Sequence, residues 1–164
     1  MQSFVAIDAG IRLADAVPLD MIAVPFGGPL RFLAVAAPDY LASHPAPTVP
    51  DELRSHRCIR QRLPSGKLYQ WEFEQAGEIR TVDVPVVLTL DHNGMMVEAA
   101  VAGMGIAYVT EKAAAEAVQK GKLVLVLESW CPPASGLCLY YPGRRHVPAG
   151  LRAFIDVLSA QLPN

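Results

Sequence analysis

Apolar residues along this chain gather in short runs that stop at proline, glycine or aspartate, a pattern typical of β-strands. The first three runs, residues 6–13, 19–26 and 30–37, follow one another with almost no helix between them. Two later runs, 69–73 and 78–82, lie close together and predict a hairpin. The remaining strands are expected at residues 57–61, 82–90, 106–109, 122–128 and 137–141.

Helices are predicted where capping residues flank the segments between these strands. Short helices are expected at residues 38–44 and 50–56. Thr110 is a suitable N-cap for a helix over residues 111–120, which starts with an acidic residue and has Gly121 just beyond its end. The chain closes with a helix over residues 147–162. Its apolar residues recur at helical spacing: Leu151, Phe154, Ile155, Leu158 and Leu162.

Residues 89–112 form the most informative stretch, because they predict a strand end, a capped helix, a short strand and the start of a second helix. Asp91 or Asn93 can cap the first of these helices, whose unpaired N–H groups would favour an anion. Gly103 and Gly105 supply the turn into the next strand. The alternative is that Asn93 is only a cap, since such a unit occurs in many α/β domains.

Composition narrows the functional classes. The chain has 164 residues, enough for one medium domain or two small lobes. It is 52% hydrophobic and 18% charged, with a mean hydropathy of +0.26, which is more apolar than a typical soluble domain. We therefore expect part of its surface to be covered by a partner molecule. A net charge of −2 and a pI of about 6.1 argue against nucleic-acid binding by these residues.

The three cysteines are Cys58, Cys131 and Cys138, an odd number with no CxxC pair. This count argues against a disulfide framework or a zinc site and predicts a reducing compartment, the cytoplasm. No cofactor or metal is expected. No apolar run is long enough to span a bilayer, and the N-terminus lacks the basic start of a signal peptide, so no membrane contact is predicted.

Several segments, taken in order, resemble the effector-binding domain of LysR-type transcriptional regulators. They are DAGIRL, DMIAVPF, LRFLAVAAPDYLASH, PDELRSHRCI, SGKLYQWEFEQAGE, the 89–112 unit, GKLVLVLESW and LCLYYPGRRHVPAGLRAFID. The resemblance covers nearly the whole chain. It implies an α/β fold like the type II periplasmic binding proteins, with two lobes joined by two crossover strands and a ligand cleft between them.

On this resemblance, residues 1–28 and 129–164 form part of a first lobe, and residues 29–128 form the second lobe with the crossover strands. Family members carry a winged helix-turn-helix, a linker helix and the start of the first lobe before the DAGIRL-like segment. We therefore expect a truncated chain with an incomplete first lobe, which would contact DNA only through a module that it lacks. Unpaired strand edges would favour a homo-oligomer.

The resemblance places the Arg12 side chain in the cleft, where its guanidinium could pair with an effector carboxylate. A surface ion pair with Asp8 or Asp15 is the alternative. Capping and packing would account for Asp91 and Asn93 about as well as ligand binding, and the capping role alone already accounts for Thr110. The predicted ligand-binding residues are Arg12, Asp91, His92, Asn93, Met95, Thr110 and Tyr141.

The predicted function is that of an effector-sensing domain of a LysR-type regulator, which binds a small organic, anionic effector in the inter-lobe cleft. One alternative is a dimerisation or interaction fragment of such a regulator that binds no ligand. A transporter's solute-binding protein would fit the fold but would need an export signal. Catalysis is not expected, since the sequence has no GxSxG, no HExxH and no phosphate-binding glycine loop.

Overall fold

The computed structural model describes residues 9–14, 17–143 and 146–160. The chain divides into two units. Unit 1 combines residues 1–30 with residues 134–164, and unit 2 is the continuous segment Arg31–Pro133. The chain therefore passes between the units twice. The lobes were predicted to divide at residues 28/29 and 128/129, and the identity of the units with those lobes stays a prediction.

Unit 1 contains a three-stranded antiparallel sheet and one helix. Strand β10 (Leu137–Pro142) is central and pairs on one side with β1 (Gly10–Leu13) and on the other with β2 (Met21–Phe26). Helix α4 (Ala149–Ala160) contacts β2. Within the described residues, β1 and β2 each pair with β10 alone, so each has an outer edge that other backbone could pair with.

Few side chains of unit 1 are buried. Among its described apolar residues only Cys138 and Leu139 are buried, and α4 has no buried residue. The large apolar side chains exposed in this unit are Ile11, Leu19, Ile22, Phe154 and Val157. Exposed apolar surface of this kind is typical of contact surfaces. The predicted homo-oligomer agrees with it but stays a prediction.

Unit 2 is built on a five-stranded mixed sheet in the order β7-β4-β8-β3-β9. The strands are β3 (Phe32–Ala36), β4 (Cys58–Gln61), β7 (Val86–Leu90), β8 (Ile106–Thr110) and β9 (Val124–Val126). Strands β7, β4 and β8 are parallel, whereas β3 runs antiparallel to both β8 and β9. The central strand β8 is buried from Ile106 to Val109, which explains its unbroken apolar run.

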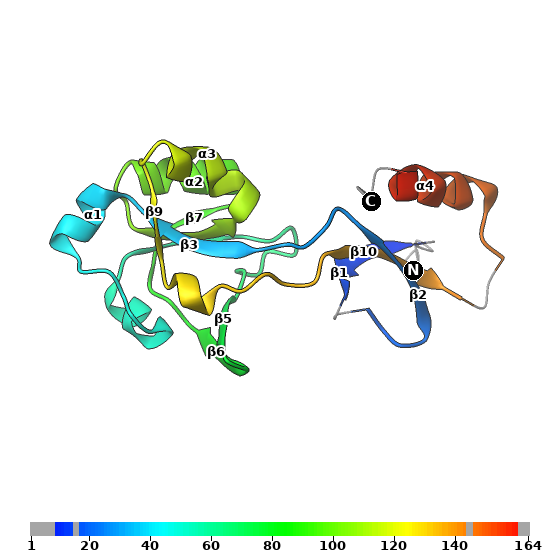
Figure 1. Cartoon of the computed structure of the whole chain (residues 1–164), viewed down its shortest axis with the longest axis horizontal. Helices are drawn as coiled ribbons and strands as arrows, with labels where there is room; N and C mark the ends of the chain where they lie inside the picture. Colours follow the sequence, from blue (N-terminus) through cyan, green and yellow to red (C-terminus); the bar gives the residue numbers. More distant parts are fainter. Residues whose placement is uncertain (1–8, 15–16, 144–145, 161–164) are drawn as a thin grey trace, which may run out of the picture. The chain divides into compact units, whose positions relative to one another are not determined.

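Helices and a hairpin cover the two faces of this sheet. The remaining elements are α1 (Pro38–Ser43), η2 (Pro50–Ser55), β5 (Trp71–Gln75), β6 (Glu78–Val82), α2 (Asn93–Val101), α3 (Glu111–Gln119) and η3 (Glu128–Trp130). Helices α2 and α3 lie on one side of the sheet, and the β5–β6 hairpin lies on the other (Figure 1). The hairpin turn uses Ala76 and Gly77, both at positive φ, as a two-residue loop requires.

The hairpin is anchored by aromatic side chains. Trp71 and Phe73 are essentially fully buried. Their ring centroids lie 5.4 and 5.2 Å from that of Tyr108 on β8, and the Tyr108 hydroxyl donates to the Glu72 carbonyl at 2.8 Å. The hairpin is therefore fixed to the middle of the sheet.

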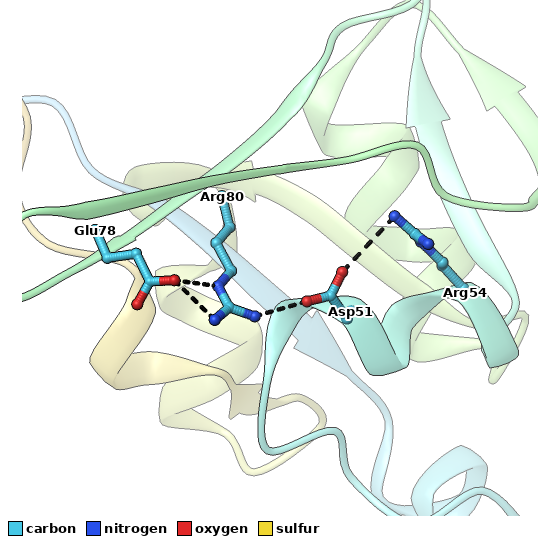
Figure 2. Close-up of polar contacts among 4 residues, drawn as sticks. All are labelled: Asp51, Arg54, Glu78 and Arg80. Carbon is cyan, nitrogen blue, oxygen red and sulfur yellow. Dashed lines mark hydrogen bonds and ion pairs between the residues drawn. The ribbon is translucent and has the colours of Figure 1, made fainter.

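A surface ionic network also holds the hairpin, as Figure 2 shows. Arg80 of β6 donates to the Glu78 carboxylate and to Asp51 of η2, each at 2.7 Å, and Asp51 also pairs with Arg54 at 3.7 Å. The Arg80 guanidinium carbon lies 5.4 Å from the ring centroid of Trp130 in η3. These pairs are solvent-exposed, so each contributes little. Together they join the hairpin to η2 and η3.

Three predicted elements differ in the structure. The strand predicted over residues 82–90 is limited to Val86–Leu90. Residues 50–55 form a 3-10 helix, one residue shorter than the predicted helix, and the His56 N–H bonds to the Leu53 carbonyl. The strand predicted over residues 122–128 is limited to Val124–Val126. Leu127 adopts a left-handed conformation with φ of 55° and ends the pairing, although it is buried and apolar.

Candidate functional site

Strands β4 and β8 of unit 2 separate toward their carboxyl ends. They pair only at Cys58↔Ile106 and Ile59↔Ala107. Beyond these pairs, β4 leads into the loop and hairpin on one face, whereas β8 leads into α3 on the other face (Figure 1). In α/β sheets, ligands bind where adjacent parallel strands lead to opposite faces. The carboxyl ends of β4 and β8 therefore form the candidate site of this unit.

Asn93, the first residue of α2, bridges the two separating strands. Its side-chain oxygen accepts the backbone N–H of Thr110 in β8 at 2.9 Å, and its Nδ2 donates to the Gln61 side-chain oxygen in β4 at 3.3 Å. The Thr110 N–H can only donate, so the orientation of the Asn93 amide is fixed. All three side chains are half-buried. Asn93 thus replaces ladder bonds that β4 and β8 no longer make.

The helix that starts here is capped by His92, not by Asp91 or Asn93 as predicted. His92 Nδ1 accepts the Gly94 N–H at 3.1 Å, and the backbone of His92 is extended as an N-cap requires. Asn93 cannot serve as the cap, because its amide is engaged with the strands, and Asp91 is exposed at the end of β7. With Nδ1 accepting, the neutral His92 ring carries its proton on Nε2 and can donate it.

The predicted cap of α3 is confirmed. Thr110 Oγ1 accepts the Ala113 N–H at 3.4 Å, and the helix extends from Glu111 to Gln119, one residue shorter than predicted. The Thr110 hydroxyl proton is left able to donate to another group. Capping and ligand contact are therefore compatible at this residue.

Aromatic side chains border the site. Phe32 of β3 lies opposite Thr110, and its ring stacks on Tyr69 at 5.3 Å and on Tyr108 at 5.4 Å. Tyr69 follows the loop after β4, and its N–H bonds to the Gln61 carbonyl at 2.8 Å. Burial raises the pKa of the Tyr69 hydroxyl, with a smaller contribution from Glu72, so the phenol stays protonated. The site thus combines amide and hydroxyl groups with an aromatic edge.

The structure brings four predicted residues together and separates the others. Asp91, His92, Asn93 and Thr110 meet at this end of the sheet. Met95 lies on α2 with 56% of its surface exposed. Gln61 was missed, although a polar residue at the end of a predicted strand is a usable signal for such a position. Its contact with Asn93 depends on the course of β4, which the sequence does not reveal.

Arg12 and Tyr141 belong to unit 1. Arg12 lies on β1 with an exposed side chain, and its guanidinium carbon lies 5.2 Å from the ring centroid of Tyr140. This contact is a cation–π interaction. Tyr141 is the next residue of β10, so its side chain points to the opposite face of the sheet. Asp8 and Asp15, the alternative partners of Arg12, lie outside the described residues.

Within residues 9–14, 17–143 and 146–160, no three His, Cys, Asp or Glu side chains are placed to hold a metal ion. None of the helices in the described ranges is both long and apolar enough to cross a membrane.

The three cysteines are buried and unpaired. Burial raises the pKa of the Cys58 thiol to about 12, and it also raises the pKa of Cys131. We expect Cys58 and Cys131 of the native chain at pH 8 to react with Ellman's reagent at least about 100-fold more slowly than a free thiol, because the thiolate is the reactive form. All three thiols should react at once in denaturant. Rapid labelling of Cys58 or Cys131 in the native chain would contradict this expectation.

Comparison with known proteins identifies the family. The LysR substrate binding domain matches residues 6–163. A putative transcriptional regulator of Pseudomonas aeruginosa is 43% identical over 95% of this chain and 51% of its own length. The uncharacterized HTH-type regulator YcaN of Escherichia coli is 38% identical over 91% of this chain and 48% of its own length.

A solved structure of a LysR-type regulator supports the same family assignment. The regulatory domain of AphB from Vibrio vulnificus superposes with a TM-score of 0.72 at 25% identity, covering 93% of this chain and 74% of that domain. The mixed α/β fold like the type II periplasmic binding proteins is thus confirmed. The chain spans about half the length of the curated relatives it matches. It belongs to the LysR substrate-binding domain family, whose members are domains of transcriptional regulators and not enzymes.

Proposed function

We propose that this chain senses a small organic effector, and that the carboxyl ends of β4 and β8 form the part of the effector site that unit 2 supplies. LysR regulatory domains bind small effectors, which makes a ligand site the first expectation for this family. The observation that carries the proposal is the separation of β4 and β8 around the half-buried side chains of Gln61, Asn93 and Thr110.

We further propose that the effector is anionic or carries a strongly polar group at this end. Helix α2 starts at the site, and the first N–H groups of a helix lack partners within it. His92 Nε2 and the Thr110 hydroxyl can add two neutral donors. A carboxylate is the simplest group that accepts from several such donors at once.

Arg12 and Tyr141 enter the proposal through the family resemblance alone. An arginine at position 12 could pair bidentately with an effector carboxylate, at the cost of its contact with Tyr140. If so, Arg12→Lys should weaken effector binding, because a lysine ammonium group cannot form the paired hydrogen bonds that a planar guanidinium makes to a carboxylate. The inter-lobe position of the cleft and a cytoplasmic location also stay predictions.

In a longer regulator, effector binding would shift an equilibrium between two arrangements and so change DNA binding by another module. A second candidate function is self-association without a ligand. The exposed Ile11, Ile22, Phe154 and Val157 of unit 1 favour it, since they would be covered in an oligomer.

A thermal-shift screen of this chain against small organic acids and amino acids tests the proposal. A compound present at 100 times its Kd should stabilise the fold by about 2.7 kcal/mol. Gln61→Ala should weaken the binding of that compound about tenfold, because it removes an amide at the strand ends. Gln119→Ala is the matched control. It changes an exposed glutamine at the far end of α3, about 13 Å along the helix from Thr110.

The screen distinguishes the two candidates. A ligand that binds wild type and Gln119→Ala equally but Gln61→Ala more weakly would support the site proposed in unit 2. Equal binding by all three proteins would remove Gln61 from the site. A chain that no compound stabilises and that light scattering finds in a stable oligomer would favour self-association.

A further inference from the structure

A cavity lies in unit 2, away from the strand ends discussed above. It has a volume of about 430 Å³ and lies between the end of α1 and η2. Its polar lining residues are Ser43, His44, Thr48, Glu52, Ser55 and His56. His56 precedes β4 and Gln61 ends it, so the two sites are about 16 Å apart along the strand. Cavities of this size hold small organic molecules.

The hydrogen bonds of Tyr40 determine which imidazole nitrogens carry protons. The Tyr40 hydroxyl oxygen accepts the Arg57 N–H at 3.0 Å, and its own proton can be donated to His56 Nδ1, also at 3.0 Å. In this arrangement the neutral His56 ring carries its proton on Nε2. Burial, followed by repulsion from His44, lowers the pKa of His56 and keeps it neutral.

His44 has the opposite tautomer. Its Nδ1 lies 3.2 Å from the Tyr40 carbonyl oxygen, which can only accept, so Nδ1 carries the proton. Ser43 Oγ also donates to this carbonyl and lies 3.0 Å from His44 Nδ1, consistent with its accepting from the ring. The His44 ring stacks on Tyr40 with centroids 4.4 Å apart, which holds it in place. In its neutral form His44 thus offers the Nε2 lone pair as an acceptor.

Glu52 adds a carboxylate to the same cavity. Its Oε2 accepts from the Thr48 N–H at 2.6 Å and from the Thr48 hydroxyl at 3.2 Å. The bond from the Thr48 N–H is the main cause that lowers the pKa of this carboxyl, so Glu52 is ionised near neutral pH. The Val49 N–H also lowers this pKa, to a smaller extent. Among the described residues, no lysine or arginine lines the cavity.

A lining with one carboxylate, one imidazole lone pair and no cationic side chain is complementary to a donor with positive charge. We propose that this cavity binds a small organic ammonium ion, whose N–H groups donate to the Glu52 carboxylate and to His44 Nε2. Pro45 and Ala46 supply an apolar wall for a short carbon chain. The site is separate from the proposed effector site and does not depend on it.

An amide-resolved NMR titration of the full chain with n-butylammonium chloride tests this proposal. Amide shifts confined to residues 43–56 and saturating with concentration are expected. 1-Butanol and sodium butyrate, which have the same carbon chain without the positive charge, should produce no such shifts. Butyrate shifting the same residues as strongly would overturn the proposal, and so would shifts centred elsewhere.

Two variants assign the contacts. Glu52→Gln keeps an oxygen for the Thr48 N–H but removes the charge, and should weaken n-butylammonium binding at least tenfold. His44→Phe keeps the stacking on Tyr40 but removes the lone pair, and should weaken it several-fold. Glu74→Gln, an exposed change on β5, is the control and should bind like wild type. Equal affinity of Glu52→Gln and Glu74→Gln would overturn the proposal even if His44→Phe failed to fold.

Discussion

Gly105→Ala should destabilise unit 2 by about 3–5 kcal/mol, because two separate costs add at this position. Gly105 has a φ of 150°, a backbone region that essentially only glycine adopts. A Cβ atom there would lie 2.3 Å from the Arg57 carbonyl oxygen and 2.8 Å from its carbon. Relief requires backbone movement, which would break the 2.8 Å bond from the Ile106 N–H to that same carbonyl. The midpoint of urea unfolding measures the loss.

Gly103→Ala is the matched control for this prediction. Gly103 lies in the same turn with a φ of 78°, but a Cβ there would meet nothing within 4 Å. Its cost should be the left-handed strain alone, about 1–2 kcal/mol. If Gly105→Ala cost no more than Gly103→Ala, the close approach to Arg57 would not be a constraint on the fold.

The turn also shows what the sequence could predict. The glycines between the α2 and β8 segments indicated a turn, and proline, glycine and aspartate located most strands to within two residues. Local patterns do this well because they reflect backbone preferences. The order of the five strands and the separation of β4 from β8 depend on contacts between residues far apart in the sequence. Local sequence patterns therefore cannot predict either feature.

Predictions for single residues from local sequence preference were limited in the same way. Asp91 and Asn93 are better N-caps than histidine by general preference, so the sequence favoured them. His92 has that role because the Asn93 amide is engaged with Gln61 and Thr110. Leu127 was likewise predicted to lie in a strand, because its hydropathy does not indicate its left-handed backbone conformation. In each case a tertiary contact or backbone constraint overrode a sound local expectation.

Asn93→Leu is expected to cost about 2–3 kcal/mol in stability. Leucine has a similar size but leaves the half-buried Thr110 N–H and the Gln61 amide without their partner, and an unpaired buried group costs about 1–3 kcal/mol. Asn93→Asp should cost less than about 1 kcal/mol. Its carboxylate still accepts from Thr110, and the Gln61 amide can turn over to donate its own N–H. Urea unfolding of the three proteins measures both differences.

The aspartate variant then separates the structural role of Asn93 from a role in effector binding. A negative charge in the first turn of α2 is compatible with the helix dipole, so the fold should persist. The same charge would repel an anionic effector bound at the strand ends, and affinity should fall at least tenfold while stability hardly changes. If Asn93→Asp bound an identified anionic effector as tightly as wild type, Asn93 would be a bridge between β4 and β8 and nothing more. The effector-binding site would then have to lie elsewhere in the chain.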